Sequence, residues 1–288
     1  MLFGAVTPFF EFAATQAAGG GRLWCNRFLM RRRQFLYAAA GAGAATSGEA
    51  QAPAGIVKAV ELRYYRMRNG NQTKSTQQFL EKAFLPAAKR AGIGPVGVFS
   101  GIIAEASPSL LCLIGYPSFE AISAAPERMA ADKEYAASCD AYNSGAEANY
   151  VRIESWLLKA FGSVEQIAFE PASGKPWKVF ELRTYESPNT ATLARKIGMF
   201  ESGGEIAIFR RTGVYPVFFG ETIAGPKMPN LTYMVGFEDT AAREKAWSMF
   251  GGDPEWQKLR LRPGLADAEV VSNISNSLWR PIAATPRG

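Results

Sequence analysis

The sequence predicts an α+β protein made of two tandem copies of one unit, with the order strand, helix, strand, strand, helix, strand. Internal repetition is the first observation: VELRYY at 60–65 returns as FELRTY at 180–185, so Glu61 and Glu181 stand 181 − 61 = 120 residues apart. Later landmarks keep nearly this step, and Gly236 follows its counterpart by 236 − 115 = 121 residues. Solenoid repeats have periods of roughly 20–50 residues, so each copy is instead a small domain with its own core.

The element order of each copy follows from its hydrophobic periodicity. An alternating strand opens the copy, an amphipathic helix follows, and Gly92 or Gly213 is suited to end that helix. Two apolar runs form a hairpin, and a second helical region is interrupted at Asp132 or Asp253, each a good helix cap, before a last strand. This order is that of a ferredoxin-like unit with an antiparallel sheet. The predicted domains are a first copy at 57–160, a linker at 161–175 and a second copy at 176–288.

Composition and charge limit the classes of partner. The 288 residues are 48% hydrophobic and 20% charged, as in an ordinary globular protein. The formal net charge is +6, of which residues 1–52 carry 5 − 2 = +3 from five arginines and two glutamates. The remaining +3 is spread among interspersed acids and bases, whereas phosphate binding needs a clustered basic face. We therefore expect no nucleic-acid partner.

Residues 1–52 are predicted to be an export leader. The run RRRQFL at 31–36 has the paired arginines of a twin-arginine signal, an Ala- and Gly-rich stretch follows, and AQA at 50–52 offers a small-x-small cleavage pattern. A transmembrane anchor is the alternative, but it needs roughly 20 apolar residues, more than this stretch holds. Met30, just before the arginines, is the expected true start. We expect a bacterial protein exported to the periplasm or the exterior, with no membrane anchor after cleavage.

Histidine is absent from the whole sequence, which limits the chemistry. Its absence removes the usual general base and the commonest metal and haem ligand. Outside the leader the only cysteines are Cys112 and Cys139, and they form no C-x-x-C pair. We therefore predict no catalytic residues, no cofactor site and no metal site.

Three features of the sequence resemble the NIPSNAP family. They are the E-L-R-x-Y opening of the second copy, the Gly-Tyr or Gly-Phe dipeptide that ends the third strand, and AWSMF at 246–250 leading to DPEW at 253–256. The resemblance covers nearly all of the second copy and, more loosely, the first, which has APERM at 125–129. It implies a dimeric α/β barrel, here an intramolecular pseudo-dimer, and leaves further homo-oligomers open. It implies a fold more than a reaction, because the family's members are mostly of unknown biochemical function.

Six residues are the candidate ligand-binding site. Strand alternation places three side chains of each copy on one face of the sheet, and in a barrel of the implied type we expect that face to look into the barrel. An arginine with free donors suits a carboxylate-bearing or phenolic ligand. The alternative is a structural ion pair that fixes how the sheets join, since paired charges in cores are commonly structural. The residues are Glu61, Arg63, Tyr65, Glu181, Arg183 and Tyr185.

Two classes of function are compatible with these features. The first, which we favour, is an exported binding or scaffold protein whose duplicated barrel holds a small apolar ligand with a polar handle, or a protein partner. The second is a small oxidoreductase of the monooxygenase type that shares the barrel fold. The absence of histidine disfavours haem ligation and simple acid/base chemistry. A purely structural interaction module is expected only if the barrel is solid.

Overall fold

The computed structural model describes residues 56–164, 166–172 and 174–284. The predicted leader, with Met30, the arginine run and the cleavage pattern, lies outside these residues. Within the described ranges no helix is both long and apolar enough to cross a membrane.

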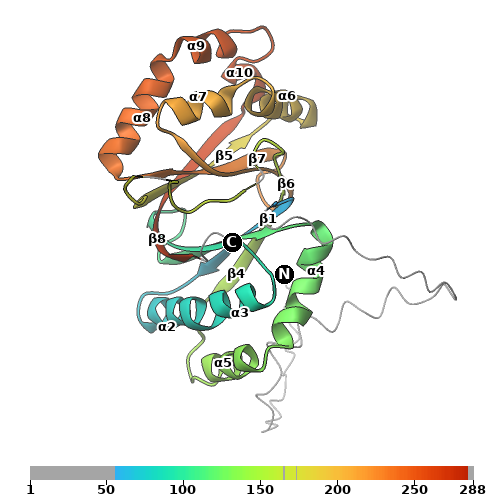
Figure 1. Ribbon diagram of the computed structural model, residues 1–288, viewed down its shortest axis with the longest axis vertical. Helices are drawn as coiled ribbons and strands as arrows, with labels where there is room; N and C mark the ends of the chain where they lie inside the picture. The colour runs from blue at the N-terminus through green and yellow to red at the C-terminus, as the bar shows by residue number, and fades with distance from the viewer. Residues whose placement is uncertain (1–55, 165, 173, 285–288) are drawn as a thin grey trace, which may run out of the picture. The chain divides into compact units, whose positions relative to one another are not determined.

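Both copies have the predicted element order (Figure 1). The elements of the first copy are β1 (Ala59–Arg66), α2 (Asn71–Phe79), the π-helical turn η2 (Leu80–Phe84), α3 (Leu85–Arg90), β2 (Val96–Ile103), β3 (Ser109–Tyr116), α4 (Phe119–Ala130), α5 (Lys133–Asn143) and β4 (Arg152–Ala160). Those of the second are β5 (Val179–Glu186), α6 (Thr190–Glu201), α7 (Glu205–Arg211), β6 (Tyr215–Ala224), β7 (Asn230–Phe237), α8 (Thr240–Gly252), α9 (Pro254–Arg260), α10 (Asp267–Val270) and β8 (Asn273–Ala284).

The predicted helix breaks occur at capping residues. The Asp132 side chain accepts a hydrogen bond from the Tyr135 amide at the start of α5, and Asp253 accepts from the amides of Glu255 and Trp256 at the start of α9. Gly92 and Gly213 have φ values of +67° and +85°, the left-handed conformation that ends a helix most readily at glycine. One break was not predicted: in the second copy the first helix is divided, because α6 ends before a Ser-Gly-Gly sequence and α7 begins after it.

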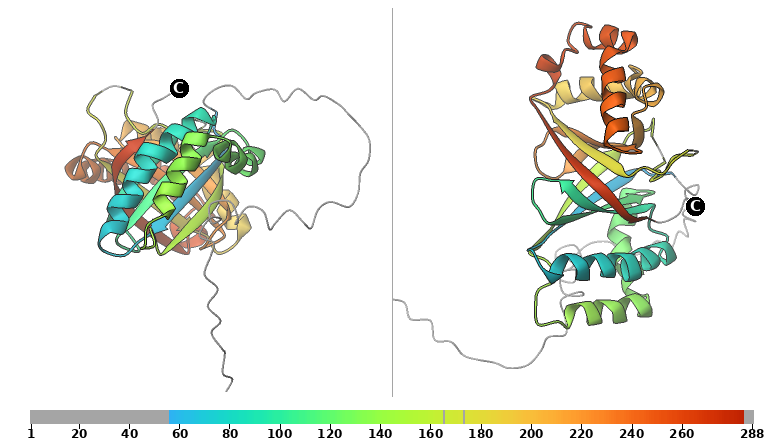
Figure 2. Two further views of the ribbon diagram at one scale, coloured as in Figure 1. Left: turned by 90° about the horizontal axis from the view of Figure 1, so that it is seen from below. Right: turned by 90° about the vertical axis from the view of Figure 1, so that its left-hand side faces the viewer.

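The eight strands form one closed antiparallel barrel with the order β1-β3-β2-β8-β5-β7-β6-β4 (Figure 2). Each copy contributes four neighbouring strands, and the two joins between copies are equivalent: β2 pairs with β8, and β6 pairs with β4. This is the arrangement that two-fold-related subunits have in a dimeric barrel. The fold is therefore the predicted dimeric α/β barrel, formed within one chain, and no sheet edge is left unpaired among the described strands.

Three apolar clusters follow from this closure. One fills the barrel and combines residues of both copies, including Leu62, Tyr64, Leu182 and Trp279. Two others lie between the sheet and the helices, one in each copy. The strands β1, β3, β5 and β7 therefore have two buried faces, one toward the barrel interior and one toward the helices of their own copy, whereas most residues of β4 and β8 are not buried.

The Gly-Tyr and Gly-Phe dipeptides have a packing role. A Cβ atom at Gly236 would overlap the ring of Trp177, which lies flat against β7. At Gly115 a Cβ would approach Val57 to 3.0 Å and Ile167 to 3.1 Å, so the linker packs directly on the backbone of β3. The segment before or after the copy crosses the strand at both positions, so Gly236 has no room for a side chain and one at Gly115 would have to displace its neighbours.

Candidate functional site

The six predicted site residues lie between the sheet and the helices. Tyr65 belongs to the apolar cluster of the first copy's helices, and the Arg63 guanidinium lies 5.6 Å from the ring of Phe84 in η2. Their strand neighbours Leu62 and Tyr64 fill the barrel instead. The prediction that the Glu-Arg-Tyr face looks into the barrel is therefore wrong. Alternation separates the two faces of a strand, but both faces are buried here. Neighbouring strands, and in the second copy helix α8 as well, supply the polar partners that satisfy the charged face.

In the first copy the buried carboxylate of Glu61 has one cation and two hydroxyl groups as partners. Arg63 donates from Nε at 2.8 Å and from Nη2 at 2.9 Å, Ser155 Oγ donates at 2.6 Å and Tyr116 OH at 3.0 Å. Burial raises the pKa of Glu61, but the Arg63 charge and these hydrogen bonds outweigh it, and the net pKa lies below the ordinary value.

In the second copy the corresponding carboxylate has two cations. Arg243 of α8 donates to Glu181 from Nε at 2.7 Å and from Nη2 at 3.0 Å, Trp247 Nε1 donates at 2.7 Å, and Arg183 Nη1 donates at 3.2 Å. Burial again raises the pKa of Glu181, and the Arg243 bond and the Arg183 charge lower it more. Arg183 lies 4.6 Å over the ring of Trp247, and its buried Nε has no hydrogen-bond partner among the described residues.

These contacts join Glu61 with Arg63, and Glu181 with Arg183, as ion pairs. Tyr65 and Tyr185 pack beside them in the helix-side clusters. Both carboxylates are fully occupied by protein donors, which is the arrangement of a structural ion pair. The role of these six residues in ligand binding remains a hypothesis.

A second buried pair, missed from the sequence, lies in the helix layer of the second copy. Lys196 of α6 and Glu205 of α7 are 1% exposed each, and their Nζ and Oε2 atoms are 3.3 Å apart. The Lys196 ammonium lies 5.0–5.4 Å from three aromatic rings, those of Tyr185, Phe200 and Trp256. Burial raises the pKa of Glu205 to about 7, although Lys196 lowers it. In the sequence, Lys196 and Glu205 are polar residues close to a Ser-Gly-Gly segment, a pattern typical of a solvated turn. The sequence therefore does not indicate that they form a buried pair.

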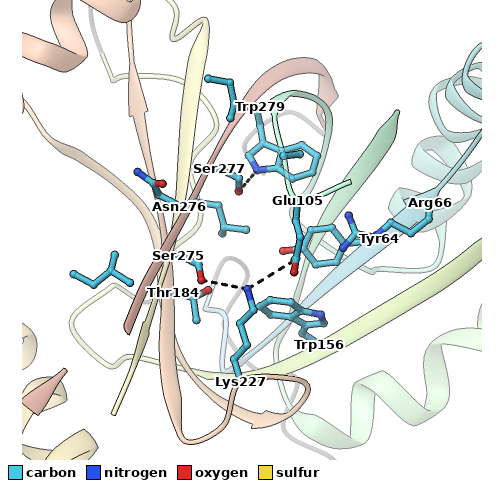
Figure 3. Close-up of a pocket in the computed structure, with 14 residues that line it drawn as sticks. Tyr64, Arg66, Glu105, Trp156, Thr184, Lys227, Ser275, Asn276, Ser277 and Trp279 are labelled. Atoms are coloured by element: carbon cyan, nitrogen blue, oxygen red, sulfur yellow. Dashed lines mark hydrogen bonds and ion pairs between the residues drawn. The ribbon is translucent and has the colours of Figure 1, made fainter. Parts of the chain in front are cut away.

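A cavity of about 410 Å³ opens at the end of the barrel where β1 and β5 finish and β4 and β8 begin (Figure 3). Two pairs of equivalent positions line it: Tyr64 with Thr184 at a step of 184 − 64 = 120, and Trp156 with Ser277 at 277 − 156 = 121. The two copies therefore meet around this space. None of the six predicted site residues lines it, although their strand neighbours do.

The two copies give the cavity unlike walls. The first copy contributes the rings of Tyr64 and Trp156, whose centroids are 5.3 Å apart, and the second copy adds to this aromatic surface the ring of Trp279, 6.0 Å from Tyr64. The second copy contributes the hydroxyl groups of Thr184 and Ser275, which point into the space in Figure 3. Behind them the wall is polar as well, because Thr184 hydrogen-bonds Thr232 at 2.8 Å.

Two ion pairs stand at the rim of the cavity. Arg66 donates to Glu154 at 2.9 and 2.7 Å, and its guanidinium lies 4.7 Å from the ring of Tyr64. Lys227, in the loop between β6 and β7, donates to Ser275 Oγ at 3.2 Å and lies 3.7 Å from Glu105 of the β2–β3 loop. The second pair thus connects one copy to the other across the opening.

A second groove, of about 850 Å³, lies on the outside of the second copy, against the linker. Its floor contains Trp177 and Phe237, and its rim carries several cations. Lys175 there is paired with Glu238 at 2.6 Å, whereas Lys245 of α8 makes no ion pair with another described residue. The groove is open, and the linker forms part of its wall. It would therefore hold a ligand in a single orientation less well than the barrel-end cavity.

The described residues contain no cluster of three or more acidic or cysteine side chains that could hold a metal ion. Cys112 is buried in the helix-side cluster of the first copy, and burial raises the pKa of its thiol to about 12, so it is not a reactive thiolate. The barrel-end cavity instead offers aromatic surfaces, hydroxyl groups and one ammonium, which are groups that bind and orient an organic molecule.

Comparison with known proteins agrees with this architecture. The NIPSNAP family model matches residues 60–158 and 180–286, one match in each copy. The chain belongs to the NIPSNAP family. No curated protein matches the sequence.

Two solved structures share the barrel fold of this NIPSNAP protein. A candidate monooxygenase from Lactobacillus acidophilus NCFM is 9% identical, with a TM-score of 0.53 over 81% of this chain and 97% of that one. A second candidate monooxygenase, from Fusobacterium nucleatum, is 10% identical, with a TM-score of 0.52 over 81% and 96%. An uncharacterized NIPSNAP-like domain protein from Burkholderia xenovorans is 24% identical over 38% of this chain and 88% of its own, with a TM-score of 0.32. At these identities the likeness concerns the fold alone.

Proposed function

We infer that this NIPSNAP protein is a small-molecule binding protein and that its ligand occupies the barrel-end cavity. The observation that carries the proposal is the pair of unlike walls built from equivalent positions, aromatic at Tyr64 and Trp156 and hydroxyl-bearing at Thr184 and Ser277. A cavity of about 410 Å³ lies within the range of ligand sites, about 300–1,000 Å³. The ligand is therefore a flat, largely apolar molecule with polar groups along one edge.

The wall geometry gives the ligand one preferred orientation. Its apolar face lies against the rings of Tyr64, Trp156 and Trp279, where burial of apolar surface contributes roughly 25 cal/mol per Å². Its polar edge faces Thr184 and Ser275, since a polar group held against the rings would lose its hydrogen bonds. The hydroxyl of Tyr64 makes no hydrogen bond to any described residue, and because burial raises its pKa it remains a protonated donor.

The binding proposal is tested by identifying what copurifies with the protein. Native mass spectrometry of the exported protein should give a mass above that of the chain, and denaturation should release an aromatic or other planar molecule. Trp156→Ala removes the central ring of the aromatic wall and should lose that mass. The matched control, Trp177→Phe, changes a tryptophan on the outer groove and should retain it. Equal occupancy in wild type and Trp156→Ala would exclude the cavity as the site.

The same preparation separates binding from oxidation. A binding protein releases its ligand unchanged, whereas an oxidoreductase of the monooxygenase type consumes oxygen and converts the recovered molecule to an oxygenated product. Oxygen consumption on addition of the recovered ligand, abolished in Trp156→Ala, would replace the binding function by an enzymatic one in the same cavity.

We also propose that the protein acts after export. The run RRRQFL at 31–36 is the feature that supports this, because the transport of folded proteins requires the paired arginines. Changing Arg32 and Arg33 to lysine together should leave the protein in the cytoplasm at its precursor mass. Normal amounts of the variant in the periplasm would contradict export by this route.

A further inference from the structure

The rim of the barrel-end cavity contains one weakly compensated cation. Of the two ion pairs there, Arg66 and Glu154 are joined by two short hydrogen bonds, and their side chains are 7% and 29% exposed. Lys227 is 26% exposed, but its acidic neighbour Glu105 is 66% exposed and stands 3.7 Å away, beyond hydrogen-bond distance. An exposed pair at this distance contributes little, typically about 0–1 kcal/mol. The charge of Lys227 is therefore available to a ligand.

The Lys227 ammonium is held at the cavity by its loop. Lys227 has φ of +61°, a left-handed conformation rare for a residue with a side chain, and it lies in a loop that has prolines at 226 and 229. Its Nζ reaches across to Ser275 Oγ, and Figure 3 places it between Ser275 and Glu105 at the open side of the cavity. An ammonium has three donors, and the contact with Ser275 uses one of them.

We propose that the ligand is an aromatic carboxylic acid whose carboxylate pairs with Lys227 and displaces Glu105 into solvent. This inference rests on the proposed function and specifies its ligand class. The ring lies against Tyr64 and Trp156, and the carboxylate, directed to the rim, accepts from Lys227 and from the hydroxyl of Ser275. A carboxylate in this position gains a charge-assisted hydrogen bond that the exposed Glu105 does not form at 3.7 Å. Glu105 is thus a resident counter-ion that keeps the empty rim neutral.

The test compares two probes of nearly equal shape, benzoate and benzamide, by isothermal titration calorimetry with protein stripped of ligand. Benzoate should bind the wild type on the order of tenfold more tightly than benzamide, as expected for one charge-assisted contact at a half-buried site. Lys227→Met should remove that preference, and Lys227→Arg should keep most of it. Glu105→Gln should tighten benzoate binding by about two- to threefold, because the competing carboxylate is lost, and leave benzamide unchanged.

Matched controls locate the effect. Lys175→Met removes the lysine of another lysine–glutamate pair, and Lys245→Met removes a lysine from the outer groove. Both should leave the preference for benzoate intact. A preference lost in Lys245→Met but kept in Lys227→Met would place the anion in the outer groove and overturn the proposal.

Two further outcomes separate this proposal from the proposed function. Equal binding of benzoate and benzamide, with both lost in Trp156→Ala, would overturn the carboxylate contact and leave the cavity as a binding site. Failure of both probes to bind, or binding of both that is indifferent to Trp156→Ala, would overturn the carboxylate proposal and the proposed function together.

Discussion

The two copies bury the same carboxylate with different partners. Glu61 has one arginine, one tyrosine and one serine, all from the barrel strands. Glu181 has two arginines, a tryptophan and, at 3.5 Å, Asn276, and two of these four come from helix α8. In the first copy the charge is balanced within the sheet. In the second copy the Glu181 carboxylate also connects helix α8 to the sheet. Its two arginines give the cluster one positive charge in excess, and Arg183 Nε has no hydrogen-bond partner among the described residues.

The same divergence recurs at other equivalent positions. Thr76, which hydrogen-bonds Tyr142 and the carbonyl of residue 149, corresponds at 196 − 76 = 120 to Lys196, which pairs with Glu205. Leu111 in the barrel core corresponds at 232 − 111 = 121 to Thr232, which continues a hydrogen-bonded network. In a homodimer each such change would occur twice. Duplication within one chain allows each half to change alone, and this is how one cavity acquires an aromatic wall and a hydroxyl wall.

The largest expected difference between the copies is the effect of removing the strand arginine. Arg63→Met leaves Glu61 buried with no cation and should lower the free energy of unfolding by about 3–5 kcal/mol. Arg183→Met leaves Glu181 paired with Arg243 and Trp247, so its loss should be smaller, about 1–2 kcal/mol. Urea denaturation of the two variants measures both values. The double variant Glu61→Leu with Arg63→Met should recover much of the loss, because no buried charge remains. Equal losses in the two copies would show that Arg243 does not compensate.

The next largest expected effect is a pH dependence of the free energy of unfolding that arises from Glu205 in the second copy. Burial raises the pKa of Glu205 to about 7 from 4.5, so the folded state binds a proton between these values that the unfolded state has released. The contribution of Glu205 is therefore fully present below about pH 4.5 and is lost as pH rises to about 7, a change of about 3 kcal/mol. The groups that face this carboxylate are Lys196, Asp267 and Arg183.

Glu205→Gln tests this dependence. Its free energy of unfolding, from urea titrations between pH 4.5 and 7, should be nearly flat where that of the wild type falls. Glu61 and Glu181 have lowered pKa values and act in the opposite direction, since their stabilisation is lost as the pH falls through and below their unfolded pKa of about 4.5. A wild-type stability that is constant across the window would contradict a raised pKa for Glu205.

The sequence was sufficient for the fold because the fold depends on local patterns. The alternation of strands and the caps at Asp132 and Asp253 each act over a few residues, the repeat shows the same patterns twice, and all agree with the structure. The cavity depends instead on contacts between residues that are far apart in the sequence. Tyr64, Lys227 and Ser275 come from both copies and meet only when the barrel closes, and alternation does not indicate which face of a strand closes inward. The Glu-Arg-Tyr face was therefore assigned to the wrong side.

The smallest expected effects come from two substitutions at the cavity walls, Thr184→Val and Tyr64→Phe, whose effects on stability and on ligand binding are compared. Thr184→Val removes the hydroxyl that bonds Thr232 and should lower the free energy of unfolding by about 1 kcal/mol. Tyr64→Phe, at the equivalent position in the first copy, removes a hydroxyl that bonds none of the described residues, so its stability should change by less than about 0.5 kcal/mol. For a ligand that accepts a hydrogen bond from the phenol, Tyr64→Phe should nevertheless weaken binding several-fold, because a donor at the cavity is lost. Paired urea denaturation and calorimetric titration of the two variants measure both quantities. A destabilised Tyr64→Phe that binds normally would make the phenol structural, and the first copy's wall would then be only an apolar surface.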